Sequence, residues 1–417
     1  MKKNRLLYFL PLALFASIFI SFYYGEDTLG RARLDSIYHE RFIYLFAENF
    51  RDGLQKYGTE EFTARNSPIF YIISSIIFNL GVSVDNLKYF NLISLLSFFL
   101  LFIKCLTLKY PNISPSHQIL FGSIIFISPT IRSLTVWPYP LTWGLLFFLI
   151  SIYYFLKFKL TQKLELKTKY SIFNVISLAI SSYITPNFAI FAIFYLFIFF
   201  NSFKVTKQLF YVISINLILA FPAFYYYLMT DFYIFKYNVW PVDTFTKYNI
   251  TNKIIIITSL IFFYFIPFTE IKRIELNKLN LIKSNKSLFF ITLFFLVNIL
   301  LFNFPTGFGG GIFYHLSFKI FNNFTLLIII FLISIILFDI YGLFTKQNII
   351  LFICLIFYNT HDAIYHKYFD PLIYFIIFFL MQFKDKISLN NKLFYKIFSF
   401  YSFFWILSVA KKFISYQ

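Results

Sequence analysis

Charged residues are scarce in this chain of 417 amino acids: Asp, Glu, Lys and Arg make up 13% of it, whereas soluble domains carry roughly a quarter. Both of its two cysteines, Cys105 and Cys354, lie in apolar runs, so we expect buried thiols rather than a disulfide or a metal site. The sequence also lacks a P-loop, a dinucleotide-binding motif, a CxxC pair and a nucleophile elbow. These absences argue against a soluble nucleotide- or redox-dependent enzyme, and we expect no cofactor.

Apolar residues are abundant instead, with 59% hydrophobic and 24% aromatic residues. A membrane-spanning helix needs about twenty apolar residues, so the sequence predicts an all-α, polytopic membrane helix bundle of about 12–13 spans. We expect one integral membrane domain over residues 1–417. The expected spans are 6–24, which lacks a signal-peptide cleavage site, 89–108, 119–136, 141–156, 171–184, 188–200, 209–229, 254–268, 288–304, 324–344, 349–357, 371–383 and, left open, 397–410.

The net charge of +19 is explained by the positive-inside rule, under which the cytoplasmic loops of a membrane protein carry an excess of Lys and Arg. The lysine-rich segments 157–169, 272–286 and 384–396 all become cytoplasmic if residues 68–84 form a re-entrant or interfacial helix instead of crossing the membrane. The excess positive charge then needs no nucleic-acid partner. The expected partner surface is the lipid bilayer.

Residues 25–67 form the predicted first outer loop, in which carboxylates are concentrated. Asp35 and His39 are four residues apart, so a helix would place both on one face. A carboxylate beside an imidazole can act as general base on an acceptor hydroxyl, and we interpret these two residues as catalytic candidates. The alternative is a solvated helix that carries charge pairs at this spacing.

Several outer-face side chains are candidates for binding a phosphate or a substrate. Cations can bind phosphate, Lys as a point charge and Arg as a fork, although headgroup contacts are the ordinary alternative. The pair His361-Asp362 with His366 fits no closed zinc spacing, so no metal is expected. The phosphate-binding candidates are Lys367, Arg65, His366 and Lys319, with Arg132 as a further outer-face cation; the substrate-loop candidates are Asn187, Tyr314 and Trp137.

Several short sequence motifs along the chain resemble motifs of the GT-C glycosyltransferases, most closely those of the dolichyl-phosphate-glucose alpha-1,2-glucosyltransferase family. Residues 35–39, Asp-Ser-Ile-Tyr-His, are similar to that family's Asp-Glu-Ile-Phe-His, and residues 68–71, Pro-Ile-Phe-Tyr, to its Pro-Gly-Leu-Tyr. Residues 87–91, 128–130 and 185–187 resemble its Leu-Arg-Phe-Val-Asn, Phe-Pro-Thr and Gln-Thr-Asn. Lys367-Tyr368-Phe369 is similar to its Arg-Tyr-Phe. Ser36 and Lys367 depart from the pattern, replacing an acid and an arginine.

The resemblance implies a GT-C-like membrane enzyme that transfers a hexose from a polyprenyl- or dolichyl-phosphate carrier to a glycan or lipid-linked acceptor. It implies Asp35 as the base and Lys367 as the cation at the leaving phosphate. We favour a bacterial plasma membrane, with the endoplasmic reticulum as the alternative. A lipid-linked saccharide transporter or flippase, and an O-antigen polymerase or ligase, remain alternative functions.

Overall fold

The chain is helical throughout the part that the structure describes. The computed structural model describes residues 2–28, 32–62, 66–229, 250–270, 285–304, 309–359, 364–384 and 387–415, and no strand occurs among them. The chain folds as two compact units. Unit 1 comprises Met1–Val242 and Phe398–Gln417, and unit 2 comprises Asp243–Ile397. The sequence predicts one membrane domain over the same residues.

Unit 1 contains the first eleven α-helices and most of the last one. Its helices are α1 (Lys2–Tyr24), α2 (Ala32–Glu48), α3 (Phe50–Lys56), α4 (Ile69–Asn79), α5 (Lys88–Lys109), α6 (Pro115–Ser123), α7 (Pro129–Val136), α8 (Pro140–Leu160), α9 (Leu164–Ile184), α10 (Phe191–Phe203), α11 (Lys207–Met229) and α18 (Asn391–Ser415). Three 3₁₀ turns, Val84–Leu87, Ile124–Ile127 and Pro186–Ile190, join neighbouring helices.

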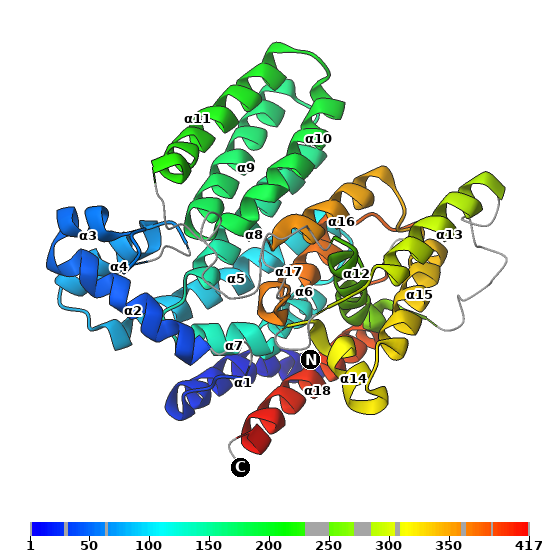
Figure 1. The fold of residues 1–417 in the computed structure, drawn as a ribbon, viewed down its shortest axis with the longest axis horizontal. Coiled ribbons are helices and arrows are strands. Elements are labelled where there is room, and N and C mark those ends of the chain that lie inside the picture. The colour runs from blue at the N-terminus through cyan, green and yellow to red at the C-terminus, as the bar shows by residue number, and fades with distance from the viewer. Residues whose placement is uncertain are drawn as a thin grey trace. The chain divides into compact units, whose positions relative to one another are not determined.

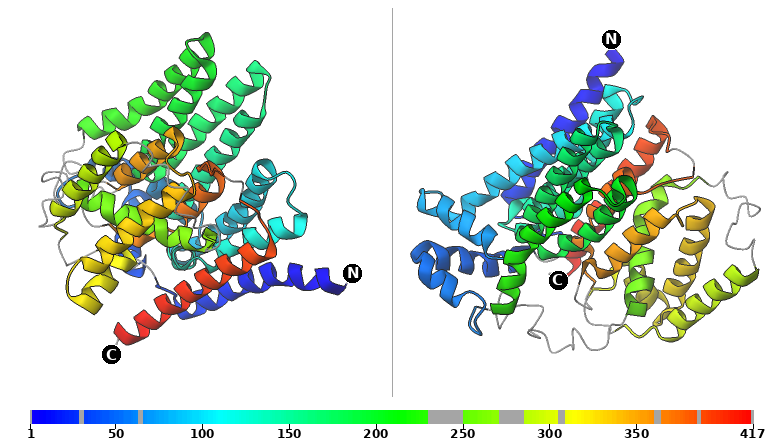
Figure 2. Two further views of the ribbon diagram at one scale, coloured as in Figure 1. Left: turned by 90° about the vertical axis from the view of Figure 1, so that its right-hand side faces the viewer. Right: turned by 90° about the horizontal axis from the view of Figure 1, so that it is seen from above.

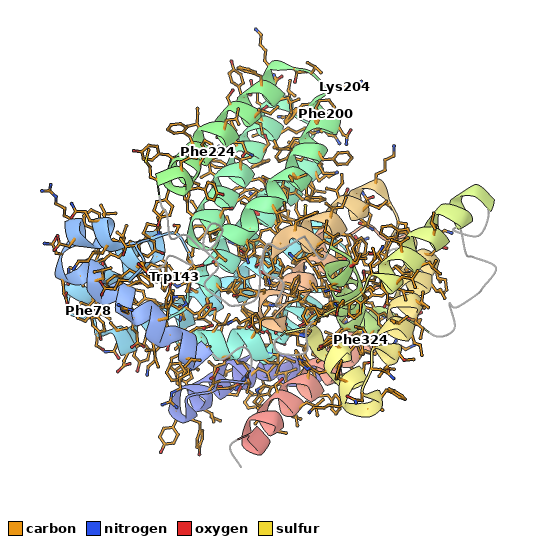
Figure 3. The ribbon with its side chains drawn as sticks, in the orientation of Figure 1. Phe78, Trp143, Phe200, Lys204, Phe224 and Phe324 are labelled. Atoms are coloured by element: carbon orange, nitrogen blue, oxygen red, sulfur yellow. The ribbon has the colours of Figure 1, made fainter. Side chains whose placement is uncertain are left out.

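Long helices build the layered part of unit 1. Helix α5 packs on α8, α8 on α9, and α9 on α11, so that α8 to α11 lie side by side (Figures 1 and 2). Phe200 on α10 and Phe224 on α11 lie at the surface, and both side chains are more than half exposed (Figure 3). Exposed aromatic side chains on apolar helices are expected where lipid, not water, is the surrounding solvent.

The segment predicted to be the first outer loop is helical, as predicted, and holds α2 and α3. Asn49 separates them, and its side-chain oxygen caps α3 by accepting from the backbone N–H groups of Arg51 (3.0 Å) and Asp52 (3.2 Å). Gly53 lets α3 approach α2 closely, because a Cβ there would lie 2.6 Å from the ring of Phe46. The loop is therefore folded back on itself, with α2 against α4.

Helix α4 corresponds to the segment predicted not to cross the membrane. Its 11 residues rise about 16 Å at 1.5 Å each, well short of the roughly 30 Å hydrocarbon core. A full crossing by this helix alone is excluded on length. Whether it is re-entrant or interfacial stays a prediction.

Helices α6 and α7 form one bent apolar element. The axis turns by 62° between Pro115–Ile127 and Pro129–Val136, where Pro129 removes a backbone donor. The Ser128 hydroxyl caps the second half by accepting from the N–H of Ile131 at 3.2 Å. After the bend, α7 contacts α1 and α5, and the Ser133 hydroxyl of α7 donates to Asp27 Oδ1 at 3.5 Å.

Unit 2 is built around α12 (Ile250–Phe265), which packs against the four α-helices that follow it. These are α13 (Asn285–Leu300), α14 (Gly311–Phe321), α15 (Thr325–Ile340) and α16 (Lys346–Tyr358). After them come the 3₁₀ turn His366–Tyr368, the short α17 (Leu372–Phe375) and the buried π-helical turn Ile376–Leu380.

Six helices in the described residues are long and apolar enough to cross a membrane, or seven if the bent pair is one span. They are Val84–Lys109, Pro140–Leu160, Pro186–Phe203, Lys207–Met229, Ile250–Phe268 and Asn391–Ala410. The chain is thus a polytopic helical membrane protein, and its described residues contain fewer full-length spans than the 12–13 predicted for the chain. Several apolar runs fold as helices of 10–17 residues, among them Thr325–Ile340 and Lys346–Tyr358.

The predicted orientation can be tested by cysteine labelling. Glu48 lies exposed at the end of α2, and Lys163 lies exposed at the start of α9. We expect Glu48→Cys and Lys163→Cys to react with a membrane-impermeant maleimide from opposite sides. The native thiols give little background, because Cys105 and Cys354 are fully buried, as predicted. Labelling of both variants from the same side would overturn the orientation.

Candidate functional site

Asp35 and His39 lie on one face of α2 and meet the same tyrosine. The hydroxyl of Tyr139 donates to Asp35 Oδ2 at 3.1 Å. The rings of Tyr139 and His39 meet edge to face, with centroids 4.7 Å apart. Asp35 is half-buried, whereas His39 is buried. The predicted helical pairing of these two residues is present, and Tyr139, just before α8, links them.

His39 is held by a second tyrosine from α4. His39 Nδ1 and Tyr71 Oη share a hydrogen bond of 2.9 Å, and the two rings stack with centroids 5.7 Å apart. The Asn66 side-chain amide donates to Tyr71 Oη at 3.5 Å, and the hydroxyl of Tyr57 donates to the carbonyl of Asn66 at 2.6 Å. The imidazole is therefore fixed in orientation, while the carboxylate beside it keeps access to solvent.

An aromatic core supports this face of α2. Phe42 and Phe46 extend the buried stripe of α2 and pack with Phe70 and Tyr71 of α4. Fully burying each large apolar side chain contributes about 1.5–3 kcal/mol. The position of Asp35 and His39 is thus set by a hydrophobic cluster and not by surface charges.

Trp137, a predicted substrate-loop residue, has its polar groups engaged within the protein. Its indole Nε1 donates to the carbonyl of Glu26 at 3.0 Å, and its carbonyl accepts from Asn91 Nδ2 at 2.9 Å. Trp143 in turn donates to Asn91 Oδ1 at 3.1 Å, from the first turns of α8 (Figure 3). Trp137 therefore anchors the segment that leads to Tyr139.

Arg132, by sequence a candidate phosphate ligand, is part of a buried ion pair. Its Nε donates to both carboxylate oxygens of Glu26, at 3.3 and 3.1 Å. Its Nη1 donates to Ser17 Oγ (2.8 Å) and to the carbonyl of Phe126 (3.2 Å), and its Nη2 to the carbonyl of Ser17 (3.2 Å) and to Ser21 Oγ (2.5 Å). All five guanidinium N–H donors are thus used, which leaves none for a phosphate.

Two members of this network, Glu26 and Trp405, are not among the residues predicted from the sequence to be functional. Trp405 Nε1 donates to Glu26 Oε1 at 2.9 Å, and its ring lies 4.4 Å from the Arg132 guanidinium carbon. Glu26 is one of many acids near the start of the first outer loop, so its type and position do not single it out. Trp405 is 379 positions from Glu26 in the sequence, so no local motif could have predicted their contact.

Unit 2 contains the predicted phosphate-binding residues Lys367 and His366. Lys367 is 5% exposed, and its ammonium lies 5.7 and 5.5 Å from the ring centroids of Tyr365 and Tyr368. Burial lowers the pKa of His366 to about 3, with the imidazole packed against Phe263. His366 is therefore neutral near pH 7 and can supply a hydrogen bond but no positive charge.

A glycine-rich turn joins the segment that carries Tyr314 to the segment that carries Lys367. The N–H of Gly310 donates to the carbonyl of Ile364 at 3.0 Å. Gly309 has φ +79°, and a Cβ there would lie 2.7 Å from the backbone nitrogen of Ile364, so no other residue fits without a shift. This contact brings the start of α14, with the buried Tyr314, to the residues just before His366 and Lys367.

The remaining predicted residues are dispersed. Lys319 is exposed in the last turn of α14, where a cation is favoured by the helix dipole. Asn187 is half-buried in the 3₁₀ turn after α9. Arg65 and the pair His361-Asp362 lie outside the described residues. In the part of the chain that the structure describes, no three His, Cys, Asp or Glu side chains are grouped to hold a metal.

The candidate site is thus best defined in unit 1, as the half-buried carboxylate of Asp35 with His39, Tyr71 and Tyr139. Comparisons of the chain with protein-family models, with curated proteins and with solved structures find no match.

Proposed function

We propose that this membrane protein is a glycosyltransferase that uses a sugar linked to a polyprenyl or dolichyl phosphate, and transfers it to a hydroxyl of a glycan or lipid-linked acceptor. One observation carries the proposal: a half-buried carboxylate, Asp35, is oriented by Tyr139 beside a buried, fixed imidazole, His39. A general base needs such fixed geometry together with access to the substrate. Both residues lie in the first loop of a chain rich in membrane-spanning helices.

The proposed reaction is a displacement at the anomeric carbon. The acceptor oxygen forms a bond to that carbon while the Asp35 carboxylate takes the hydroxyl proton. The bond between the anomeric carbon and the phosphate oxygen breaks, and its electron pair leaves with the lipid phosphate. The Tyr139 hydroxyl, which donates to Asp35 Oδ2, orients the carboxylate for this proton transfer.

The resemblance of residues 367–369 to Arg-Tyr-Phe is the ground on which we propose Lys367 as the cation at the leaving phosphate. Lys367 is almost fully buried, and its ammonium lies near the rings of two tyrosines. Compared with an exposed lysine, it therefore loses less hydration when a phosphate binds, and its position is already fixed before binding. His366, neutral by burial, serves at most as a hydrogen-bonding neighbour.

Substitution of Lys367 tests this assignment. We expect Lys367→Ala to raise the KM for the lipid-phosphate donor and lower kcat, by roughly tenfold or more in kcat/KM, because a preorganised charge at the phosphate is lost. Lys367→Arg keeps the charge and should retain more activity. Lys346→Ala, at the exposed start of α16, is the matched control. Near-wild-type kinetics in both Lys367 variants would remove this residue from the site.

Sugar transfer by the purified protein tests the proposed function itself. The protein, in lipid nanodiscs, is supplied with a panel of short-chain polyprenyl-phosphate sugars and candidate acceptors, and release of polyprenyl phosphate is measured. Nucleotide sugars and sugar-free lipid phosphate are the controls. Transfer from a lipid-linked donor alone supports the proposal. Lipid-linked sugar that crosses the bilayer of liposomes without transfer would instead favour the transporter alternative.

A further inference from the structure

Three helices converge on the carboxylate of Glu26 in unit 1. Arg132 reaches it from α7, Ser21 donates to it from α1, and Trp405 donates to it from α18, which lies beside α1 (Figure 2). Thr28 Oγ1 adds a further hydrogen bond of 3.1 Å. Glu26 and Arg132 are almost completely buried, with 9% and 2% side-chain exposure. Their geometry is therefore fixed by protein partners and not by water.

The residue after Glu26, Asp27, is hydrogen-bonded to the start of α2. Asp27 Oδ1 accepts from the N–H of Ala32, at the start of α2, at 2.7 Å. The Ser133 hydroxyl of α7 donates to the same Asp27 oxygen at 3.5 Å, and Thr28 donates to the carbonyl of Pro129 at 3.2 Å. Asp27 therefore ties the segment that carries Glu26 to the helix that has Asp35 in its first turn.

Glu26 also contacts the segment that carries Tyr139, the other partner in the hydrogen bond with Asp35. The backbone carbonyl of Glu26 accepts from Trp137 Nε1 at 3.0 Å, and Trp137 precedes Tyr139 by two residues. Tyr139 is the side chain that orients Asp35. Asp35 is thus connected to Glu26 through Asp27 and the hydrogen bond between Asp27 and Ala32. Tyr139 is connected to Glu26 through the hydrogen bond between Trp137 and the Glu26 carbonyl.

We infer that Trp405 is a positioning residue for the site around Asp35. Its indole N–H and its ring hold Glu26 and Arg132 in the arrangement that fixes both the start of α2 and the segment that ends in Tyr139. The effect on sugar transfer rests on the proposed function; the effect on the geometry does not. A hydrogen bond to a charged group changes an equilibrium constant by about tenfold or more, enough to loosen this arrangement when it is lost.

The test uses Trp405→Phe, which keeps an aromatic ring for Arg132 but removes the N–H donor to Glu26. Hydrogen–deuterium exchange is measured for the peptide covering the start of α2 and for a peptide from α9. We expect exchange at the start of α2 to rise about tenfold with α9 unchanged. In the transfer assay we expect kcat to fall about three- to tenfold with the acceptor KM nearly unchanged.

Phe403→Ala, at an exposed position of the same helix, is the matched control and should change neither readout. If Trp405→Phe does not fold, Trp405→Met, which also has no N–H or O–H donor in its side chain, replaces it. Unchanged exchange at the start of α2, or equal increases in α2 and α9, would overturn the inference. If the wild-type protein transfers no sugar, the proposed function fails while the exchange result still decides the role of Trp405.

Discussion

Asp35→Asn should abolish most sugar transfer, lowering kcat by about a hundredfold or more, the usual scale for loss of a general base. The amide keeps the size of the side chain and can still accept from Tyr139, so the helix and its packing should persist. What is lost is the basic oxygen that takes the acceptor proton. The measurement is single-turnover transfer from a lipid-linked donor at saturating acceptor.

Two acids of the same helix serve as controls. Glu48 is exposed at the far end of α2, and Glu48→Gln should leave transfer nearly unchanged. Burial and the nearby Asp85 raise the pKa of Glu40, but Glu40 is one turn away from Asp35 and Glu40→Gln should cost far less. If all three variants transfer sugar equally well, Asp35 is not the base and the proposed function loses its catalytic centre.

Glu26→Gln should destabilise the fold strongly, reducing the free energy of unfolding by about 3–5 kcal/mol. Arg132 would keep its charge while 2% exposed, without the carboxylate that balances it. Thermal unfolding in nanodiscs, followed by tryptophan fluorescence or by scanning calorimetry, measures the loss. The double variant Glu26→Gln with Arg132→Met should recover part of it, since a buried pair can be replaced by apolar groups.

The exposed ion pair in the first loop is the matched control for this experiment. Arg41 and Glu61 lie 3.4 Å apart, but their side chains are 53% and 70% exposed. Pairs of this kind contribute about 0–1 kcal/mol, so Glu61→Gln should hardly change the unfolding temperature. Equal effects of Glu26→Gln and Glu61→Gln would mean that burial does not strengthen the Glu26–Arg132 pair.

The helical class and the pairing of Asp35 with His39 were predictable because both depend on local pattern. Apolar runs specify membrane helices, and a spacing of four residues places two side chains on one helical face. The number of full-length spans was not predictable in the same way. Runs such as 324–344 are long in sequence, but the helix ends at Ile340, where a turn with Gly342 at φ +66° follows.

The partners of the predicted residues could not be read from the sequence. Tyr71 and Tyr139 are two among 32 tyrosines, and nothing local distinguishes those that meet His39. The sequence around Arg132 does not distinguish an arginine that binds a phosphate from one that pairs with a carboxylate inside the protein. Its role follows from burial and from Glu26, more than a hundred residues away. Long-range contacts of this kind depend on tertiary packing, which composition and periodicity do not specify.

The contact between Trp405 and Glu26 also has a consequence for biosynthesis. The two residues are 379 positions apart, so at roughly 5–20 residues per second the ribosome adds Trp405 about 20 to 75 seconds after Glu26. Glu26 and Arg132 are therefore both synthesised well before the indole donor exists. During that interval the Glu26–Arg132 pair lacks the contacts that Trp405 of α18 later supplies.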